Sequence, residues 1–414
     1  MKQMDRAQAA PLPEGFNFID PDRLQSGVPM AEFALLRRNA PVWWNAEDPE
    51  TGPFRDGGFW VISRHRDVRA ISRNSDDWSA NAHGVIMSYP DHVDPSAHEQ
   101  SKAMIINQDP PMHTRLRQIV SRMFTPRGVA ALEDTLREAA HKYVAEAAEK
   151  GSGDFIADIA SRLPLDGIAE LLGIPHADRH EVLRWANATI NFADPDPELS
   201  PVMANANLVG YAYNMAESRR KQPADDIVTR LVNADIDGEH LTELEFSFFV
   251  IILAVAGNDT SRNAIGHGMN AFLDNPDQWE LFKRERPPTT ADEIVRWATP
   301  IHCFQRTALR DVEIEGVKIR KGQRVGMFYS SANYDETVFD DPHRFDVTRD
   351  PNPHLGFGGS GIHYCLGANL ARMEIRLIFE AIADIIPGIA KLAEPQRTRS
   401  GLINSLRSFQ VQYR

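Results

Sequence analysis

One cysteine in the sequence stands where its sulfur could bind a metal. Cys365 follows the glycine-rich segment 357–361, and a helical pattern begins at Ala368. This spacing predicts a tight loop that presents the sulfur at a helix N-terminus, where amides and the helix dipole favour a thiolate. The glycines would let the loop backbone approach something large and flat. The alternatives are a small buried apolar cysteine, or a phosphate loop, for which the required glycine–lysine spacing is missing.

A second conflict between residue type and setting lies in the longest predicted helix, residues 241–273. Residues 246–255 are apolar on every side, which predicts a buried helix. The polar run Ala-Gly-Asn-Asp-Thr-Ser at 256–261 interrupts them. Such local conflicts point to functional or strained sites. Alternatively, the Thr260 hydroxyl only bonds the carbonyl of Ala256 one turn back.

Two pairs of charged residues share predicted helix faces. Glu293 and Arg296 lie three residues apart. Thr290 and Glu293 also match a capping box, in which Glu293 would only cap its own helix. His113 and Arg117 lie four apart on a predicted helix at 113–124. They form either a site or a solvated basic face.

Composition bounds the class of protein. The 414 residues carry a net charge of −13, which argues against nucleic-acid binding. Two cysteines, Cys303 and Cys365, form no disulfide framework and fit a reducing cytoplasm. Residues 1–16 lack the apolar core of a signal peptide. The longest apolar run, 246–257, is shorter than the ~20 residues of a membrane span. We therefore expect a soluble cytoplasmic protein.

The remaining elements predict one mainly α domain with a minor β region, an α+β fold over residues 1–414. Helical periods cover 66–73, 129–148, 155–172, 179–192 and 203–222, and strand patterns cover 41–44, 59–62, 311–329 and 406–413. Residues 79–109 form a long loop, in which Val85, Ile86 and Met87 are either a satellite core contact or a pocket wall. Residues 340–353 form an irregular meander before the cysteine loop.

Together, the cysteine loop, the 256–261 run, Glu293-x-x-Arg296 and His113-x-x-x-Arg117 resemble the cytochrome P450 family of haem-thiolate monooxygenases. The four features occur in the family's order, and the resemblance covers nearly the whole chain. It implies haem b (iron protoporphyrin IX) with Cys365 as the axial thiolate, which pushes electron density toward bound oxygen.

The resemblance also implies roles for other residues. Asp259 and Thr260 match the acid–alcohol pair that delivers protons, and Gly257 would leave room for oxygen. Glu293 and Arg296 match a structural ion pair closed by a meander arginine, here Arg344. The haem propionates would be held by His113, Arg117, Arg306 and His363. Further haem contacts would come from Ala256, Gly257, Thr260, Phe304, Phe357, Gly358, Leu366, Gly367 and Ala371.

Within the family, the chain looks most like the bacterial steroid C26-monooxygenases, which oxidise the terminal methyl of a cholesterol-type side chain. Similar stretches are 41–45, 121–127, 276–281 and 293–300, and Phe357 stands eight residues before Cys365 as in this branch. The departures are Asp259 for glutamate, His302 and Cys303 over the haem, Leu402 for tryptophan, and Met87 onward. The implied substrate pocket comprises Val85, Ile86, Met87, Val255, Ala256, Ile301, His302 and Leu402.

The resemblance implies partners as well. A ferredoxin, reduced by a ferredoxin reductase, would dock behind Cys365 on Arg115, Arg122 and Arg372. The hydrophobic substrate would enter under a lid formed by residues 185–213 and 79–109. The alternatives are an omega-hydroxylase of methyl-branched fatty acids or terpenoids, a haem-based sensor, and a zinc site at His302, Cys303, His363 and Cys365.

Overall fold

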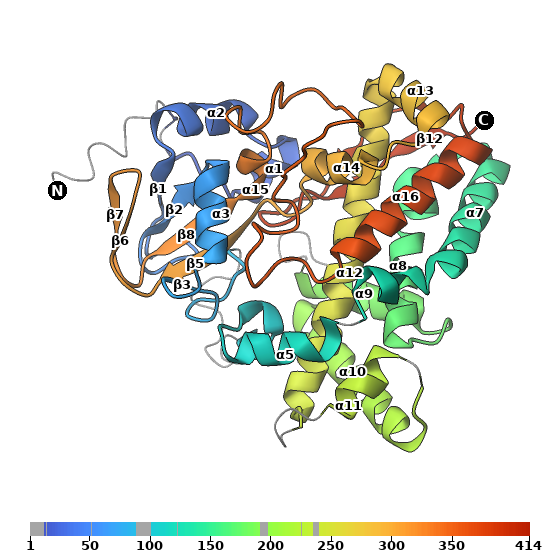
Figure 1. The fold of residues 1–414 in the computed structure, drawn as a ribbon, viewed down its shortest axis with the longest axis horizontal. Coiled ribbons are helices and arrows are strands. Elements are labelled where there is room, and N and C mark those ends of the chain that lie inside the picture. Colours follow the sequence, from blue (N-terminus) through green and yellow to red (C-terminus); the bar gives the residue numbers. More distant parts are fainter. Residues whose placement is uncertain are drawn as a thin grey trace.

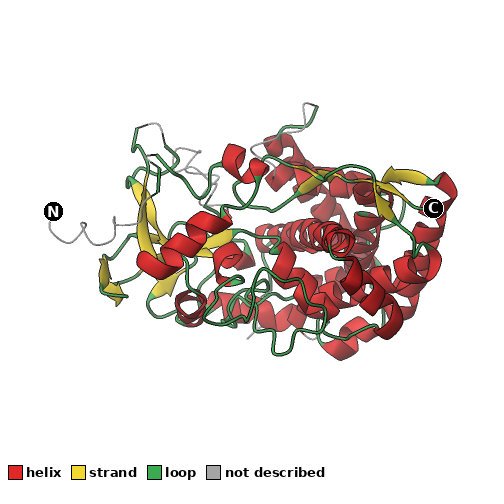
Figure 2. Cartoon of the chain, turned by 90° about the horizontal axis from the view of Figure 1, so that it is seen from above, coloured by secondary structure: helices red, strands yellow, loops and turns green. Residues whose placement is uncertain are grey.

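The structure is a computed structural model that describes residues 12–13, 15–50, 52–87, 101–121, 123–190, 198–224, 226–234 and 240–414. Helices dominate one side of the molecule and the largest sheet lies on the other, while a few short strands lie among the helices near the C-terminus (Figures 1 and 2). This distribution confirms the mainly α fold with a minor β region.

The organising element is helix α12, Glu243–Asp274. A capping box starts it: Thr242 Oγ1 accepts from the Glu245 amide at 3.2 Å, and Glu245 accepts from the Thr242 amide at 2.8 Å. Figure 1 shows α12 running through the helical part, and Figure 2 shows it nearly end-on with helices around it. It alone, among the described residues, has the length and composition to cross a membrane. Most of that apolar stretch is buried inside the protein, as in the core helix of many soluble proteins.

The other helices pack around α12 or beside the main sheet. In chain order they are α1 (Pro21–Ser26), α2 (Met30–Asn39), α3 (His65–Arg73), η1 (Ile105–Asn107), α5 (Met112–Ser121), α6 (Pro126–Ala130), α7 (Glu133–Lys150), η2 (Ile156–Ala160), α8 (Arg162–Leu172), α9 (Arg179–Ile190), α10 (Pro201–Lys221), α11 (Ile227–Val232), α13 (Pro276–Glu285), α14 (Thr290–Ala298), α15 (Tyr329–Ala332) and α16 (Ala368–Ile385).

Two predicted helices begin differently from the expectation. The predicted helix 129–148 divides into α6 and α7. The predicted helix 155–172 opens with η2, a π-helical turn in which the Ser161 amide and hydroxyl both donate to the carbonyl of Ile156, at 3.0 and 2.7 Å. The turn shifts the register before α8, so the apolar faces of η2 and α8 both meet α12.

The main sheet has five strands in the order β1-β2-β8-β5-β3, where β2 and β8 are parallel and the other pairs antiparallel. Its strands are β1 (Val42–Ala46), β2 (Gly58–Ile62), β3 (Trp78–Ser79), β5 (Cys303–Ala308) and β8 (Arg324–Phe328). Small sheets contain β4 (Ser152–Asp154), β6 (Val312–Ile314), β7 (Val317–Ile319), β9 (Ala390–Lys391), β10 (Gln396–Arg397), β11 (Leu406–Ser408) and β12 (Gln410–Gln412).

Strand β5 escaped the sequence prediction for a physical reason. A half-buried strand alternates apolar and polar residues, but β5 is buried on both faces and contains Gln305, Arg306 and Thr307. Its polar side chains are inside the protein and give no two-residue period. This strand carries part of the candidate site.

Candidate active site

The cysteine loop is a tight turn, as predicted. The Cys365 amide donates to the Phe357 carbonyl at 2.8 Å, and positive φ angles occur at Gly358 (83°) and Ser360 (66°). A Cβ at Gly361 would lie 1.6 Å from the Ser72 carbonyl oxygen of α3. Gly361 is therefore required for packing against α3. At Gly358 a Cβ would meet only the His363 carbonyl oxygen, at 3.6 Å.

The electrostatics of Cys365 differ from the sequence expectation. Burial raises the pKa of its thiol, while the Gly367 amide and the charges of Arg117 and Arg372 act in the opposite direction. The helix terminus thus opposes burial but does not overcome it. Both arginines are held in place: Arg117 donates to the Tyr364 carbonyl at 2.6 Å, and Arg372 to Asp292 at 2.8 Å.

Four side chains that are, or can become, cationic gather beside this loop. The rings of His113 and His363 are 4.2 Å apart. Burial, together with the charges of Arg117 and Arg306, lowers the pKa of His113 to about 4. Burial and the same two arginines also lower the pKa of His363, to about 2. In the described part of the chain, none of the four forms an ion pair with a carboxylate.

This cluster fits a group with two carboxylates. Arg306 is 5% exposed, and the buried Nδ1 of His113 has no hydrogen-bond partner among the described residues. Buried cations without counter-charges are costly, and a carboxylate that accepts from them would relieve that cost. The residues predicted to hold the haem propionates are therefore together and chemically suited to that group.

The central helix opens to one side at the predicted polar run. Ala256 is exposed and Val255 and Thr260 are partly exposed, whereas residues 246–251 are buried. The Thr260 hydroxyl donates to the Ala256 carbonyl at 2.8 Å. The hydrogen bond anticipated as an alternative is thus present, and the hydroxyl oxygen can still accept one.

Asp259 and Gly257 face other neighbours than Thr260 does. Asp259 is 5% exposed and pairs with Arg262, which donates to Ser405 Oγ at 3.0 Å. A Cβ at Gly257 would lie 3.0 Å from the side chain of Ile168 in α8. The close packing of α12 on α8 therefore explains Gly257 without the predicted need for oxygen space.

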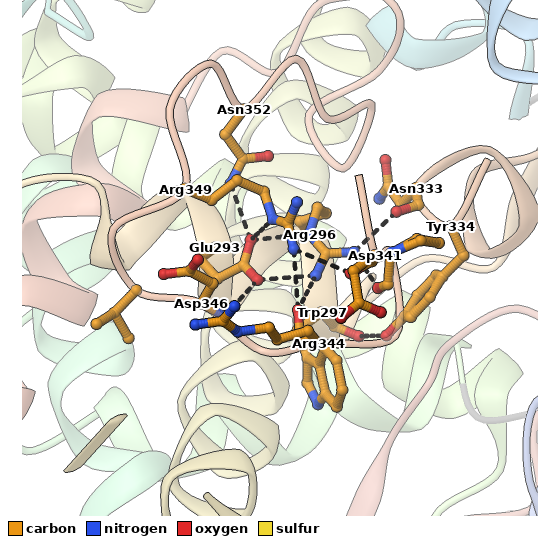
Figure 3. A network of polar contacts seen from close by, with 12 residues as sticks. Glu293, Arg296, Trp297, Asn333, Tyr334, Asp341, Arg344, Asp346, Arg349 and Asn352 are labelled. Carbon is orange, nitrogen blue, oxygen red and sulfur yellow. Dashed lines mark hydrogen bonds and ion pairs between the residues drawn. The ribbon is translucent and has the colours of Figure 1, made fainter. Parts of the chain in front are cut away.

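The predicted ion pair is buried and closed (Figure 3). Glu293 and Arg296 are both 0% exposed and joined by two hydrogen bonds of 2.8 Å. The closing arginine is Arg349, with Nε 3.2 Å from Glu293 Oε2, so the prediction of Arg344 is wrong. Arg344 contributes its carbonyl, which accepts from Arg296 at 3.3 Å and from Arg349 at 3.0 Å. The capping-box alternative is also wrong, because the helix begins after Thr289 without a side-chain cap.

Only some of the predicted pocket residues have side chains that are partly exposed. Ile86, Ile301 and Phe304 are partly exposed, and the Gln305 amide donates to the Val85 carbonyl at 2.8 Å, which ties this loop to β5. Val85 and Leu402 are buried, at 1% and 6% exposure.

Met87 and His302 of the predicted pocket are also buried. Met87 is 1% exposed in a phenylalanine-rich core cluster, with its sulfur 3.5 Å from that of Cys303. His302 is 2% exposed, and burial with the charge of Arg397 lowers its pKa to about 3. Both side chains therefore lie inside the protein, close to the start of β5.

Other predictions are only partly covered by the structure. Residues 88–100 and 191–197 of the predicted lid, and Arg122 of the docking face, lie outside the described residues. η1 lies against α12, so the sequence interpretation missed Met104 and Ile105 as neighbours of that helix. No group of three or more His, Cys, Asp or Glu that could hold a metal occurs in the part of the chain that the structure describes, so the zinc alternative has no support.

Comparison with known proteins defines the class. The family model for Cytochrome P450 matches residues 289–383. A solved Mycobacterium marinum cytochrome P450 in complex with pseudoionone has a TM-score of 0.87 and 36% identity, and the match covers 98% of this chain and 100% of that chain. The chain belongs to the cytochrome P450 family and is an enzyme, a monooxygenase. The sensor alternative is therefore wrong.

Two relatives indicate which branch of the family the chain resembles. The chain is 56% identical over 403 residues to the "Steroid C26-monooxygenase" of Rhodococcus jostii RHA1, covering 97% of this chain and 86% of that protein. It is 40% identical over 404 residues to the "Methyl-branched lipid omega-hydroxylase" of Mycobacterium tuberculosis H37Rv, covering 94% and 92%. The resemblance to the steroid branch is confirmed. The family implies haem with a cysteine thiolate ligand, a hydrophobic substrate and, in bacteria, ferredoxin-type reduction.

Proposed function

We propose that this enzyme hydroxylates the terminal methyl (C26/C27) of a cholesterol- or cholestenone-type steroid side chain, using O2 and two electrons from a ferredoxin. The observation that carries the substrate class is the 56% identity, over nearly the whole chain, to an enzyme named for that reaction. The second candidate, omega-hydroxylation of methyl-branched lipids, is supported by the 40% identical relative.

Haem b would be held through its iron and through its propionates. Cys365 would bind the iron, and His113, Arg117, Arg306 and His363 would hold the two propionates. The two arginines supply positive charge and the two histidines can donate hydrogen bonds, and none of the four pairs with a carboxylate among the described residues. Bound haem supplies oxygen binding and activation at its iron. Further contacts are proposed for Ala256, Gly257, Thr260, Phe304, Phe357, Gly358, Leu366, Gly367 and Ala371.

Thr260 and Asp259 would deliver the protons that the reaction needs. The Thr260 hydroxyl donates a hydrogen bond to the Ala256 carbonyl. Its oxygen can therefore still accept a hydrogen bond from water on the partly exposed face of α12. Asp259 lies next in the chain, with its carboxylate engaged by Arg262. Release from Arg262 would let this carboxylate carry a proton toward Thr260.

Selectivity for a terminal methyl needs positioning, because a primary C–H bond is harder to break than the neighbouring tertiary one. The partly exposed apolar side chains of Ile86, Val255, Ile301 and Phe304 could orient a rigid lipid end-on. Holding one carbon in reach and the next out of reach lets geometry overrule bond strength.

The ferredoxin, itself reduced by a ferredoxin reductase, would dock behind Cys365. Arg372, whose charge acts on Cys365, and Arg115 would offer positive charge there in an otherwise acidic protein. We further propose that residues 1–414 form one domain and that the enzyme works in the cytoplasm.

A substrate titration tests this function. The purified ferric protein is titrated with cholest-4-en-3-one while the Soret band is followed. A low-to-high-spin shift that saturates at low concentration supports a steroid in the pocket. A shift with a methyl-branched fatty acid and none with the steroid would move the substrate to the second candidate.

A further inference from the structure

An acid on α14 joins two other parts of the chain beside the cysteine loop. Asp292 Oδ1 accepts a hydrogen bond from Nε of Arg372 on α16 at 2.8 Å, and it lies 2.9 Å from Nε2 of His354. His354 stands three residues before Phe357, where the cysteine loop begins. The function proposed above uses Arg372 only for docking and gives Asp292 and His354 no role.

The hydrogen bonds of His354 fix which ring nitrogen carries the hydrogen. Nδ1 lies 3.2 Å from the backbone nitrogen of Gly356, which can only donate, so Nδ1 accepts. The hydrogen of the neutral ring is then on Nε2, which donates to Asp292. A Cβ at Gly356 would lie 2.6 Å from Cγ1 of Val295, so a glycine is required here. The backbone of the loop therefore aims a buried histidine at the acid.

Asp292 carries a negative charge in this arrangement. Burial opposes its ionisation, but the hydrogen bond from His354 and the charge of Arg372 outweigh burial and lower the pKa of Asp292. The side chains of Arg372 and Asp292 are 33% and 29% exposed. Solvent therefore weakens the electric field of this pair but does not remove it.

Arg372 also faces the cysteine loop. Its Cζ lies 4.6 Å from the centre of the Phe357 ring, and its Nη2 lies 3.5 Å from the Tyr364 hydroxyl. The charge of Arg372 acts on Cys365 and favours the thiolate, whereas Asp292 is not among the groups that act on this sulfur. Asp292 therefore holds a cation close to the sulfur, and places its own opposite charge further away.

We propose that the Arg372–Asp292 pair, held by His354, sets the reduction potential of the haem. Uptake of one electron makes the site more negative by one charge, and a fixed cation favours that state. Arg372 raises the potential, and Asp292 moderates this effect. Asp292 and His354 are positioning residues, because they act through Arg372. The inference rests on the proposal that Cys365 binds the haem iron.

A redox titration of the substrate-free holoenzyme tests this proposal, with dithionite as the reductant, mediator dyes and no ferredoxin. Arg372→Gln should lower the equilibrium constant for one-electron reduction roughly tenfold, which corresponds to about 59 mV. Arg376→Gln is the matched control, since Arg376 lies one turn further along α16 and donates to Glu133 at 2.8 Å. The control should keep the potential of the unchanged enzyme. Equal shifts in the two variants would contradict the proposal.

Asp292→Asn should move the potential in the opposite direction. The asparagine oxygen can still accept from His354 and Arg372, so the cation stays in place while its counter-charge is lost. The equilibrium constant for reduction should rise roughly threefold. A merely structural role would move Arg372→Gln and Asp292→Asn in the same direction. An unchanged or lower potential in Asp292→Asn would overturn the proposal, even if Arg372→Gln bound too little haem to be titrated.

The carbon monoxide complexes separate this inference from the ligand assignment on which it rests. Both variants should keep the red-shifted Soret band after reduction, because Cys365 is unchanged. Absence of that band from the unchanged enzyme would refute Cys365 as the ligand. Presence of the band with equal potentials in all variants would refute only the role of the pair. Neither measurement needs a substrate, so both are independent of the steroid assignment.

Discussion

At the residue scale, the account depends first on Cys365. Cys365→Ser should abolish the red-shifted Soret band of the reduced carbon monoxide complex, because the thiolate ligand is lost. Cys303→Ala is the control, since Cys303 is 0% exposed and packs on Met87. That control should keep the band and lose only about 1 kcal/mol of stability. A normal band in Cys365→Ser would show that another residue binds the iron.

The second residue-scale prediction concerns Thr260. Thr260→Ala should retain haem and the substrate-induced spin shift, because the Thr260 hydroxyl bonds Ala256 of its own helix. Product formation should fall by up to about 100-fold while electrons are lost to peroxide. Thr260→Ser keeps the hydroxyl and should remain coupled. Tight coupling in Thr260→Ala, measured as product per NADH consumed, would remove the threonine from proton delivery.

At the scale of elements, the meander is fastened to α14 by Arg349. Removing its side chain in Arg349→Ala takes away its contact with the buried Glu293, and should lower the free energy of unfolding by about 2–3 kcal/mol and weaken haem retention. Arg344→Ala is the matched control, because Arg344 contributes its backbone carbonyl to this network. Urea unfolding of both variants decides between the two arginines, and equal losses would contradict the structure.

A buried histidine links α12 to the segment before β11 and predicts a pH dependence. Nε2 of His267 is 3.0 Å from the Asn404 carbonyl, and burial lowers the pKa of His267 from 6.5 to about 3. The unfolded chain binds a proton below pH 6.5 that the folded protein refuses. This histidine should therefore lower the free energy of unfolding by about 1.4 kcal/mol per pH unit as pH falls from 6.5 toward 3.

Urea unfolding between pH 7 and 5 checks this dependence. His267→Gln should reduce the slope of stability against pH by about one proton. The exposed His176→Gln is the control. A slope that His267→Gln leaves unchanged would mean that His267 is not buried as a neutral side chain.

The sequence predicted those elements that have a regular hydrophobic period or a fixed spacing of charged residues. The apolar run predicted the buried helix α12, and the three-residue spacing predicted the ion pair of Glu293 and Arg296. Both predictions work because a helix fixes which residues share a face. Arg349 could not be chosen over Arg344, because the meander has no period. β5 was missed because its polar side chains are buried.

At the scale of the whole molecule, the resemblance predicted more than any single motif. The four motifs lie far apart in the sequence. Proteins that share a fold have such motifs in the same order along the chain. That order predicted the family, which the 56% identical relative confirms. Composition alone predicted only that the protein is large and acidic and has a buried core.

The most direct test of the central claim is the site of hydroxylation. Purified enzyme, supplied with a ferredoxin, its reductase and NADH, is incubated with cholest-4-en-3-one, and the products are identified by mass spectrometry and NMR. The account predicts a primary alcohol at the terminal methyl, C26 or C27. Hydroxylation at the neighbouring tertiary carbon or on the rings would contradict it, as would turnover of a methyl-branched fatty acid with none of the steroid.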